Sequence, residues 1–157
     1  IADRRDLNPP ACLQTLYNLL DRQIEREVVP AVQKYGLGLV PYSPLAGGVL
    51  SGKYGAGATG LPPESRAARQ GFTDAGRPGH IPVLSERNLA VARRLAKLAQ
   101  ARRTTASRLA IAWTLAQPAV TSIIVGASTV EQVDDAVAGA GEMLNAEDVA
   151  TISALGE

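Results

Sequence analysis

The sequence predicts an α/β fold built on a parallel β-sheet, with right-handed helical connections between the strands. Two observations support this prediction. Apolar runs at residues 37–42 and 120–127 show no alternation of apolar and polar residues, which is typical of strands buried on both faces. Segments with helical spacing lie between the runs, so the expected order is strand, helix, strand, long loop, two helices, strand and two helices.

The first half of the chain gives two strands, one helix and a loop. Residues 12–17 read CLQTLY, a short and moderately apolar run that predicts a strand. We expect the next helix to contain Pro30 in its first turn, where the missing N–H costs nothing, and to stop at Gly36. The second strand is predicted at 37–42. Residues 43–84 are rich in Gly and Pro and predict a long loop, and loops of this length in compact domains are usually functional or disordered.

Capping residues mark the helices of the second half. Ser85 and Thr105 are good N-cap residues ahead of two segments with apolar stripes, the second of which holds Trp113 as an expected core residue. Two overlapping capping boxes in residues 128–132 predict a helix that starts at 128–130. Residues 145–148, NAED, open a last short helix in the same way.

Composition excludes several classes of protein. The 157 residues carry 16 basic and 15 acidic side chains, a net charge of +1, which gives no electrostatic reason to expect a nucleic acid or a membrane partner. Cys12 is the single cysteine, so an intrachain disulfide is impossible and a reducing compartment fits. No apolar run reaches the ~20 residues of a membrane span, and no metal-ligand spacing occurs. We therefore expect a cytoplasmic protein, and the start at Ile1 leaves open that the chain is a fragment.

One glycine-rich stretch raises the question of phosphate binding. Residues 47–53, GGVLSGK, match the P-loop spacing G-x-x-x-x-G-K, in which a helix begins at the lysine and a following Ser or Thr holds Mg²⁺. Tyr54 stands at that last position, and five Gly and Pro residues within 55–63 prevent a helix. We therefore reject ATP hydrolysis and kinase chemistry.

A phosphate can still be bound in another way. In parallel α/β folds, ligands bind at the carboxyl ends of the strands. Residues 40–48 and 123–132 both run from a predicted strand into a polar loop. Gly47, Gly48 and Gly126 would let backbone N–H groups approach a ligand closely, although each could equally serve a tight turn.

Charged groups and an aromatic ring are also expected at the carboxyl ends of these strands. The helix that begins near Ser128 would point its positive end toward these ends, and Lys53 and Arg66 would add cations. Two anion-binding loops suit a dinucleotide. Tyr42 offers a face for a flat ring, although a tyrosine at a strand end is as often a residue at the edge of the core.

Three stretches taken together resemble the aldo-keto reductases. These are YSPLAGGVLSGKY at 42–54, QTLYNLL at 14–20 before it and IVGASTVEQ at 124–132 after it. The similarity is greatest to the branch with bacterial general reductases and potassium-channel beta subunits, and PESR at 63–66 and AIAW at 110–113 fit that branch. The resemblance runs through roughly residues 12–155 in the right order.

The resemblance implies a (β/α)8 TIM barrel that binds NADPH and reduces a small carbonyl substrate. Such a barrel takes about 250 residues. Residues 1–157 would therefore be the C-terminal portion of a single barrel domain, the last three βα units with a long loop after the second strand. The family's catalytic Asp, Tyr, Lys and His would precede this chain, so we expect no catalytic residue here and no activity from the fragment alone. A non-catalytic NADP(H)-sensing module stays open, as does a truncated product that self-associates through an exposed sheet edge.

The resemblance also implies a set of cofactor contacts. Gln14 would hydrogen-bond the nicotinamide carboxamide, and Tyr42 would stack on the nicotinamide ring. The complete implied set is Gln14, Tyr42, Ser43, Pro44, Leu45, Ala46, Gly47, Lys53, Arg66, Gly126, Ser128, Gln132 and Asp135.

Within that set, the loop at 43–47 would hold the pyrophosphate, with Lys53 and Arg66 closing over it. Gly126, Ser128 and Gln132 would surround a ribose with a 2′-phosphate, and Asp135 would meet the adenine side. The family often has proline at the position of Val125 and asparagine at that of Ala136, and the second change removes one polar contact to the base. A homo-oligomer stays open as the assembled form.

Overall fold

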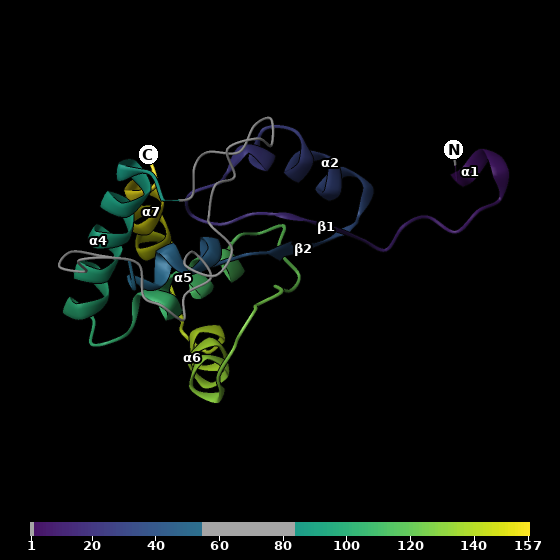
Figure 1. The fold of residues 1–157 in the computed structure, drawn as a ribbon. Helices are drawn as coiled ribbons and strands as arrows, with labels where there is room; N and C mark the ends of the chain where they lie inside the picture. Colours follow the sequence, from purple (N-terminus) through teal and green to yellow (C-terminus); the bar gives the residue numbers. More distant parts are fainter. Residues whose placement is uncertain (1, 55–83) are drawn as a thin grey trace.

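The computed structural model describes residues 2–54 and 84–157, and its sheet is parallel as predicted (Figure 1). Strands β1 (Cys12–Leu16) and β2 (Gly38–Tyr42) pair in register from Cys12 opposite Gly38 to Leu16 opposite Tyr42. Helix α2 (Val28–Tyr35) connects them and ends at Gly36, whose φ of 65° is left-handed. The expected strand–helix–strand unit is confirmed.

The prediction of a third regular strand at 120–127 is wrong. Only two isolated parallel bridges join this segment to β2, Leu39 to Val120 and Tyr42 to Ile124. The ladder breaks between them because Pro41 has no N–H to donate. Two residues of β2 lie between the bridges, opposite three residues of the partner segment, so the partner carries one extra residue.

The prediction that the strands are buried on both faces is also wrong for most of their residues. Leu39 and Pro41 of β2 are buried, but its other residues are half-buried or exposed, and the first three residues of β1 are exposed. The segment 120–127 contains no buried residue. Within the described residues, helices therefore cover only part of this small sheet.

The helices of the second half follow the predicted caps. Ser85 and Thr105 accept hydrogen bonds from the backbone of Asn88 and Arg108 at the start of α4 and α5. Thr129 caps α6, and Asn145 forms a complete capping box with Asp148 in α7. The helices and 3₁₀ helices other than α2 are α1 (Ala2–Arg5), η1 (Gln23–Glu25), η2 (Ala46–Ser51), α4 (Glu86–Ala101), α5 (Ala106–Leu115), α6 (Val130–Ala140) and α7 (Ala146–Leu155).

The core lies between η2, α4, α5, α7 and the end of β1. Trp113 is fully buried at its centre, as predicted, and its ring centroid lies 5.6 Å from that of Tyr17. The indole N–H donates to Ser153 Oγ at 2.9 Å, which attaches α7 to α5. Helix α6 packs on α5 and stands apart from α4 and α7 (Figure 1).

A polar cluster borders this core. The Tyr17 hydroxyl donates to Glu25 Oε1 at 2.6 Å, and Arg22 Nε donates to the same oxygen at 2.8 Å. Burial and the hydrogen bond to Glu25 raise the pKa of Tyr17 far above its ordinary value. Burial by itself would raise the pKa of Glu25, but the hydrogen bonds from Arg22 and Tyr17 lower it below the usual range.

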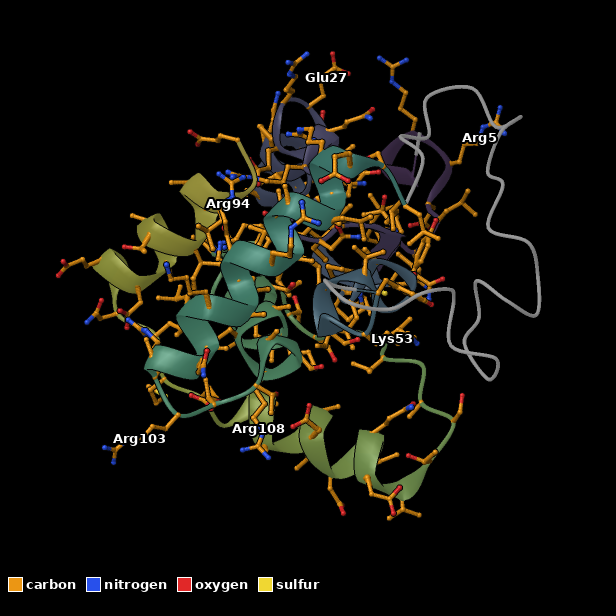
Figure 2. All side chains as sticks on the ribbon, turned by 60° about the vertical axis from the view of Figure 1, so that its left-hand side comes forward. Arg5, Glu27, Lys53, Arg94, Arg103 and Arg108 are labelled. Carbon is orange, nitrogen blue, oxygen red and sulfur yellow. The ribbon has the colours of Figure 1, made fainter. Side chains whose placement is uncertain are left out.

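Charged side chains otherwise point outward from the helices (Figure 2). Among residues 2–54 and 84–157, no helix combines the length and the apolar character that a membrane crossing requires. The same residues contain no group of His, Cys, Asp or Glu arranged to hold a metal ion.

Candidate cofactor site

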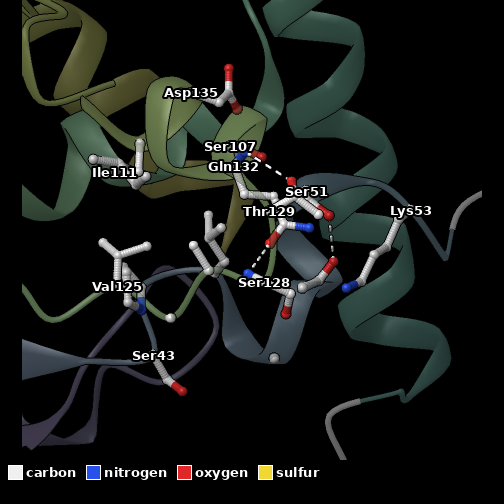
Figure 3. Close-up of a pocket in the computed structure, with 17 residues that line it drawn as sticks. Ser43, Ser51, Lys53, Ser107, Ile111, Val125, Ser128, Thr129, Gln132 and Asp135 are labelled. Carbon is white, nitrogen blue, oxygen red and sulfur yellow. Dashed lines mark hydrogen bonds between the residues drawn. The ribbon is translucent and has the colours of Figure 1, made fainter. Parts of the chain in front are cut away.

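A pocket of about 670 Å³ opens where β2 ends beside the segment 120–126 (Figure 3). The bridge between Tyr42 and Ile124 brings the two strand ends together, as predicted from the two motifs. The loop into η2 forms one wall, residues 125–129 and the start of α6 form the second, and Ser107 and Ile111 of α5 also line the pocket. The volume falls within the range of small-molecule sites.

The wall at η2 has an unusual backbone. Ser43 and Ala46 adopt left-handed φ values of 58° and 48°, and Gly47 and Gly48 follow at 64° and 95°. Residues with a side chain rarely hold this conformation unless their surroundings fix it. Asn18, buried at the end of β1, does so by donating from Nδ2 to the Ser43 carbonyl at 3.0 Å.

Helix geometry here differs from that of a P-loop. Element η2 ends at Ser51, and residues 52–54 form turns, so no helix begins at Lys53. The lysine instead folds back over Gly48. A Cβ at Gly48 would lie 2.4 Å from Lys53 Cε, and the ammonium lies 5.2 Å from the centroid of the Tyr54 ring. The rejection of ATP chemistry agrees with this geometry.

The opposite wall is the N-terminus of α6. Thr129 Oγ1 accepts from the Gln132 N–H at 3.3 Å, and Gln132 Oε1 accepts from the Ser128 N–H at 2.9 Å. The Glu131 carboxylate also accepts hydrogen bonds at this helix start. Bonds from its own backbone N–H and from Thr129 lower its pKa. The N–H donors at the helix start are therefore engaged by polar side chains of the same segment, so an anion bound there would replace these contacts.

Two charged side chains line the described part of the pocket, Lys53 and Asp135. Asp135 Oδ1 lies 2.7 Å from Arg108 Nε. The Thr105 hydroxyl lies 3.2 Å and 3.1 Å from the two oxygens of the same carboxylate. The only acidic group that lines the described pocket is therefore held by partners from the start of α5.

Most of the predicted cofactor contacts meet in this pocket. It is lined by Ser43, Pro44, Leu45, Gly47, Lys53, Gly126, Ser128, Gln132 and Asp135. Gln14 and Tyr42 lie outside it, both exposed, in β1 and at the end of β2. Ala46 is buried beneath the wall, where it shapes the loop rather than lining the pocket. Arg66 lies outside the described residues.

Sequence reasoning did not identify several lining residues. They are Ser51, Ser107, Ile111, Val125, Ala127 and Thr129. Ser107 and Ile111 are four residues apart and so share one face of α5. That spacing could have grouped them, but no local signal says which element the face meets.

Comparison with known proteins places these features in context. A sequence model of the Aldo/keto reductase family matches residues 2–157. The L-glyceraldehyde 3-phosphate reductase of Escherichia coli (strain K12) is 36% identical over 125 residues, which are 79% of this chain and 35% of that protein. A "Probable voltage-gated potassium channel subunit beta" of Oryza sativa subsp. japonica is 37% identical over 134 residues, 85% of this chain and 39% of that protein. The chain thus spans little more than a third of the length of these relatives.

Proposed function

This chain belongs to the aldo/keto reductase family, and we propose that it supplies the cofactor-binding half of an NADPH-dependent carbonyl reductase. The observation that carries the proposal is the pocket at the joined strand ends. It collects residues from 43–53 and 125–136, stretches that are far apart in the sequence. Family membership makes a nicotinamide dinucleotide the expected ligand.

The residues present fit the phosphates of such a cofactor. Four residues of the loop at 43–48 have left-handed φ values, and most of the loop lines the pocket. Lys53 can move from Gly48 to a pyrophosphate because its side chain is exposed. Ser128 and Gln132 at the start of α6 would hold a phosphate on the ribose. Tyr42 offers an exposed ring for the nicotinamide, and Gln14 would hydrogen-bond the nicotinamide carboxamide from β1.

Bound NADPH would supply a hydride to the carbonyl carbon of an aldehyde or ketone. The task of this chain is to position the cofactor and to keep the ring at the strand ends. We propose that residues 1–157 form the C-terminal portion of one barrel domain. The proton donor and its partners would then come from strands that precede this chain, because an eight-stranded barrel needs about 250 residues.

Binding can be tested without turnover. We expect NADPH to bind the protein in calorimetric titration and to raise its melting temperature. Lys53→Met should weaken binding by about tenfold through the lost charge. Lys97→Met removes a lysine from α4 outside the pocket and should leave affinity unchanged. A wild-type protein that binds neither NADPH nor NADH would refute the cofactor proposal.

A second candidate function rests on the relatives. Similarity to the protein named as a channel beta subunit is 37% over 134 residues, as high as the 36% over 125 residues for the reductase. The alternative is a non-catalytic NADP(H)-sensing module, with a homo-oligomer as its assembled form. NADPH binding without oxidation by a panel of aldehydes and ketones, in the complete polypeptide where these residues are part of a longer one, would favour it.

A further inference from the structure

We propose that Leu16 and Ile124 are positioning residues that flank the ring of Tyr42 and form with it an apolar platform for the nicotinamide. The platform rests on the proposed function and extends it, because it names the side chains that fix the ring-binding end of the site. The sequence motifs implied a role for Tyr42 and none for its two neighbours, which come from opposite halves of the chain.

The strand register puts the three side chains in one row. Leu16 lies opposite Tyr42 in the parallel pairing of β1 with β2, and Ile124 forms the isolated bridge with Tyr42 at the other edge of β2. The Ile124 N–H donates to the Pro41 carbonyl at 2.7 Å, which holds the segment at this position. Paired residues of a sheet point to the same face, so Tyr42 lies in the middle of the row.

The row lies on the face of the sheet away from the helical core. Leu39 and Pro41 are the buried residues of β2, so they mark its core side. Tyr42 follows Pro41 and therefore points the other way, in agreement with its exposed fraction of 40%. Ile124 is 41% exposed, and Leu16 is half-buried. A flat ring can therefore lie on the row without displacing a core residue.

The row adjoins the pocket at the carboxyl ends of the strands. Ser43 and Val125, which directly follow Tyr42 and Ile124, both line the pocket (Figure 3). Ligands of parallel α/β folds bind at these strand ends. A dinucleotide with its phosphates in the pocket would therefore carry its ring out over the row.

The flanking side chains restrict the tyrosine. A side chain that loses rotamer freedom on binding lowers the affinity, so a ring that is already confined loses less. Leu16 and Ile124 confine the Tyr42 ring from both sides and add apolar area beside it. Gln14, two residues before Leu16 in β1, points to the same face, which places an amide group on the side of the sheet where the ring would lie.

The test separates the nicotinamide from the rest of the cofactor. Calorimetry gives dissociation constants for NADPH and for ADP-ribose 2′-phosphate, which keeps the phosphates and lacks the nicotinamide. Leu16→Ala and Ile124→Ala should each weaken NADPH binding about fivefold and change binding of ADP-ribose 2′-phosphate less than about twofold. Leu16→Met conserves volume and should retain most of the NADPH affinity. At saturating protein, the emission of bound NADPH should lie closer to that of free NADPH in Leu16→Ala than in the wild type.

A matched control lies in the same strand. Leu13 is 38% exposed and pairs with the buried Leu39, so it points to the opposite face of β1. Leu13→Ala should leave both dissociation constants unchanged. The platform is refuted if the two alanine variants weaken both ligands equally, if neither alters NADPH binding, or if the wild type binds NADPH no more tightly than ADP-ribose 2′-phosphate. If the wild type binds neither ligand, the proposed function itself has failed, and the platform with it.

Discussion

Asn18 provides the sharpest test of how the pocket wall is held. Its side chain is only 2% exposed and makes three hydrogen bonds. Nδ2 donates to the Ser43 carbonyl at 3.0 Å, and Oδ1 accepts from the N–H groups of Leu20 and Asp21 at 2.9 Å and 3.0 Å. The residue therefore shapes the turn after β1 and fixes the left-handed start of the cofactor loop at the end of β2.

The cost of Asn18→Ala follows from these partners. The Ser43 carbonyl keeps a bond from Ala46 N, and Asp21 N keeps one to the Asn18 carbonyl, so each of those losses costs about 1 kcal/mol. The buried Leu20 N–H loses the hydrogen-bond partner that Asn18 provides, which adds roughly 1–3 kcal/mol. We expect the free energy of unfolding in urea to fall by about 3–5 kcal/mol.

Asn18→Asp tests the positioning of the loop directly. It keeps the two acceptor bonds but buries a carboxylate with one oxygen against the Ser43 carbonyl, so it should destabilise the fold at least as much as alanine does. NADPH binding should weaken by about tenfold, because the loop loses its fixed conformation. If Asn18→Asp binds NADPH as tightly as wild type, then Asn18 does not position this wall and the reasoning is wrong.

Four further outcomes follow from the packing and from the ionisable groups at the border of the core. Gly139→Ala should destabilise the protein by about 1–3 kcal/mol in thermal unfolding, because the methyl group meets the α5 backbone, whereas Gly141→Ala, with a nearest contact of 3.5 Å, should be tolerated. Gly48→Ala should lower NADPH affinity, since its φ of 95° disfavours a side chain and Lys53 would have to move. The lowered pKa of Glu25 contributes stability that is lost as the pH falls below about 4. The raised pKa of Tyr17 contributes stability that is lost as the pH rises above about 10, and Tyr17→Phe should remove that alkaline loss in a pH series of unfolding midpoints.

The features that sequence could predict are local ones. Three helix starts were predicted from their N-cap residues, Ser85, Thr105 and Asn145. An N-cap side chain bonds to a backbone group only three residues away, so the signal is contained in a short stretch of sequence. Gly36 ends α2 for a similarly local reason. Strand regularity at 120–127 was mispredicted because the obstacle, Pro41, lies in a different strand.

The same distinction applies to the pocket. The contacts within 43–47 and those at 126, 128 and 132 were predicted because the motifs that carry the family resemblance are contiguous stretches, and the structure brings most of them together. Ser107, Ile111 and the Arg108–Asp135 pair were missed because they depend on how α5 docks against α6. Helix docking is decided by side-chain volume at sites such as Gly139, which a single sequence does not mark.

Both walls of the pocket are thus positioned by residues that do not line it. Asn18 holds the wall at η2 from the end of β1, while Arg108 holds Asp135 in the wall at α6 from the start of α5. Within residues 2–54 and 84–157 the two side chains share no hydrogen-bond partner, and they belong to different elements. Their effects on NADPH binding should therefore add to within about 0.5 kcal/mol when Asn18→Asp and Arg108→Met are combined. A larger deviation would mean that the walls move as one unit, and the separate roles given to the two residues would have to be abandoned.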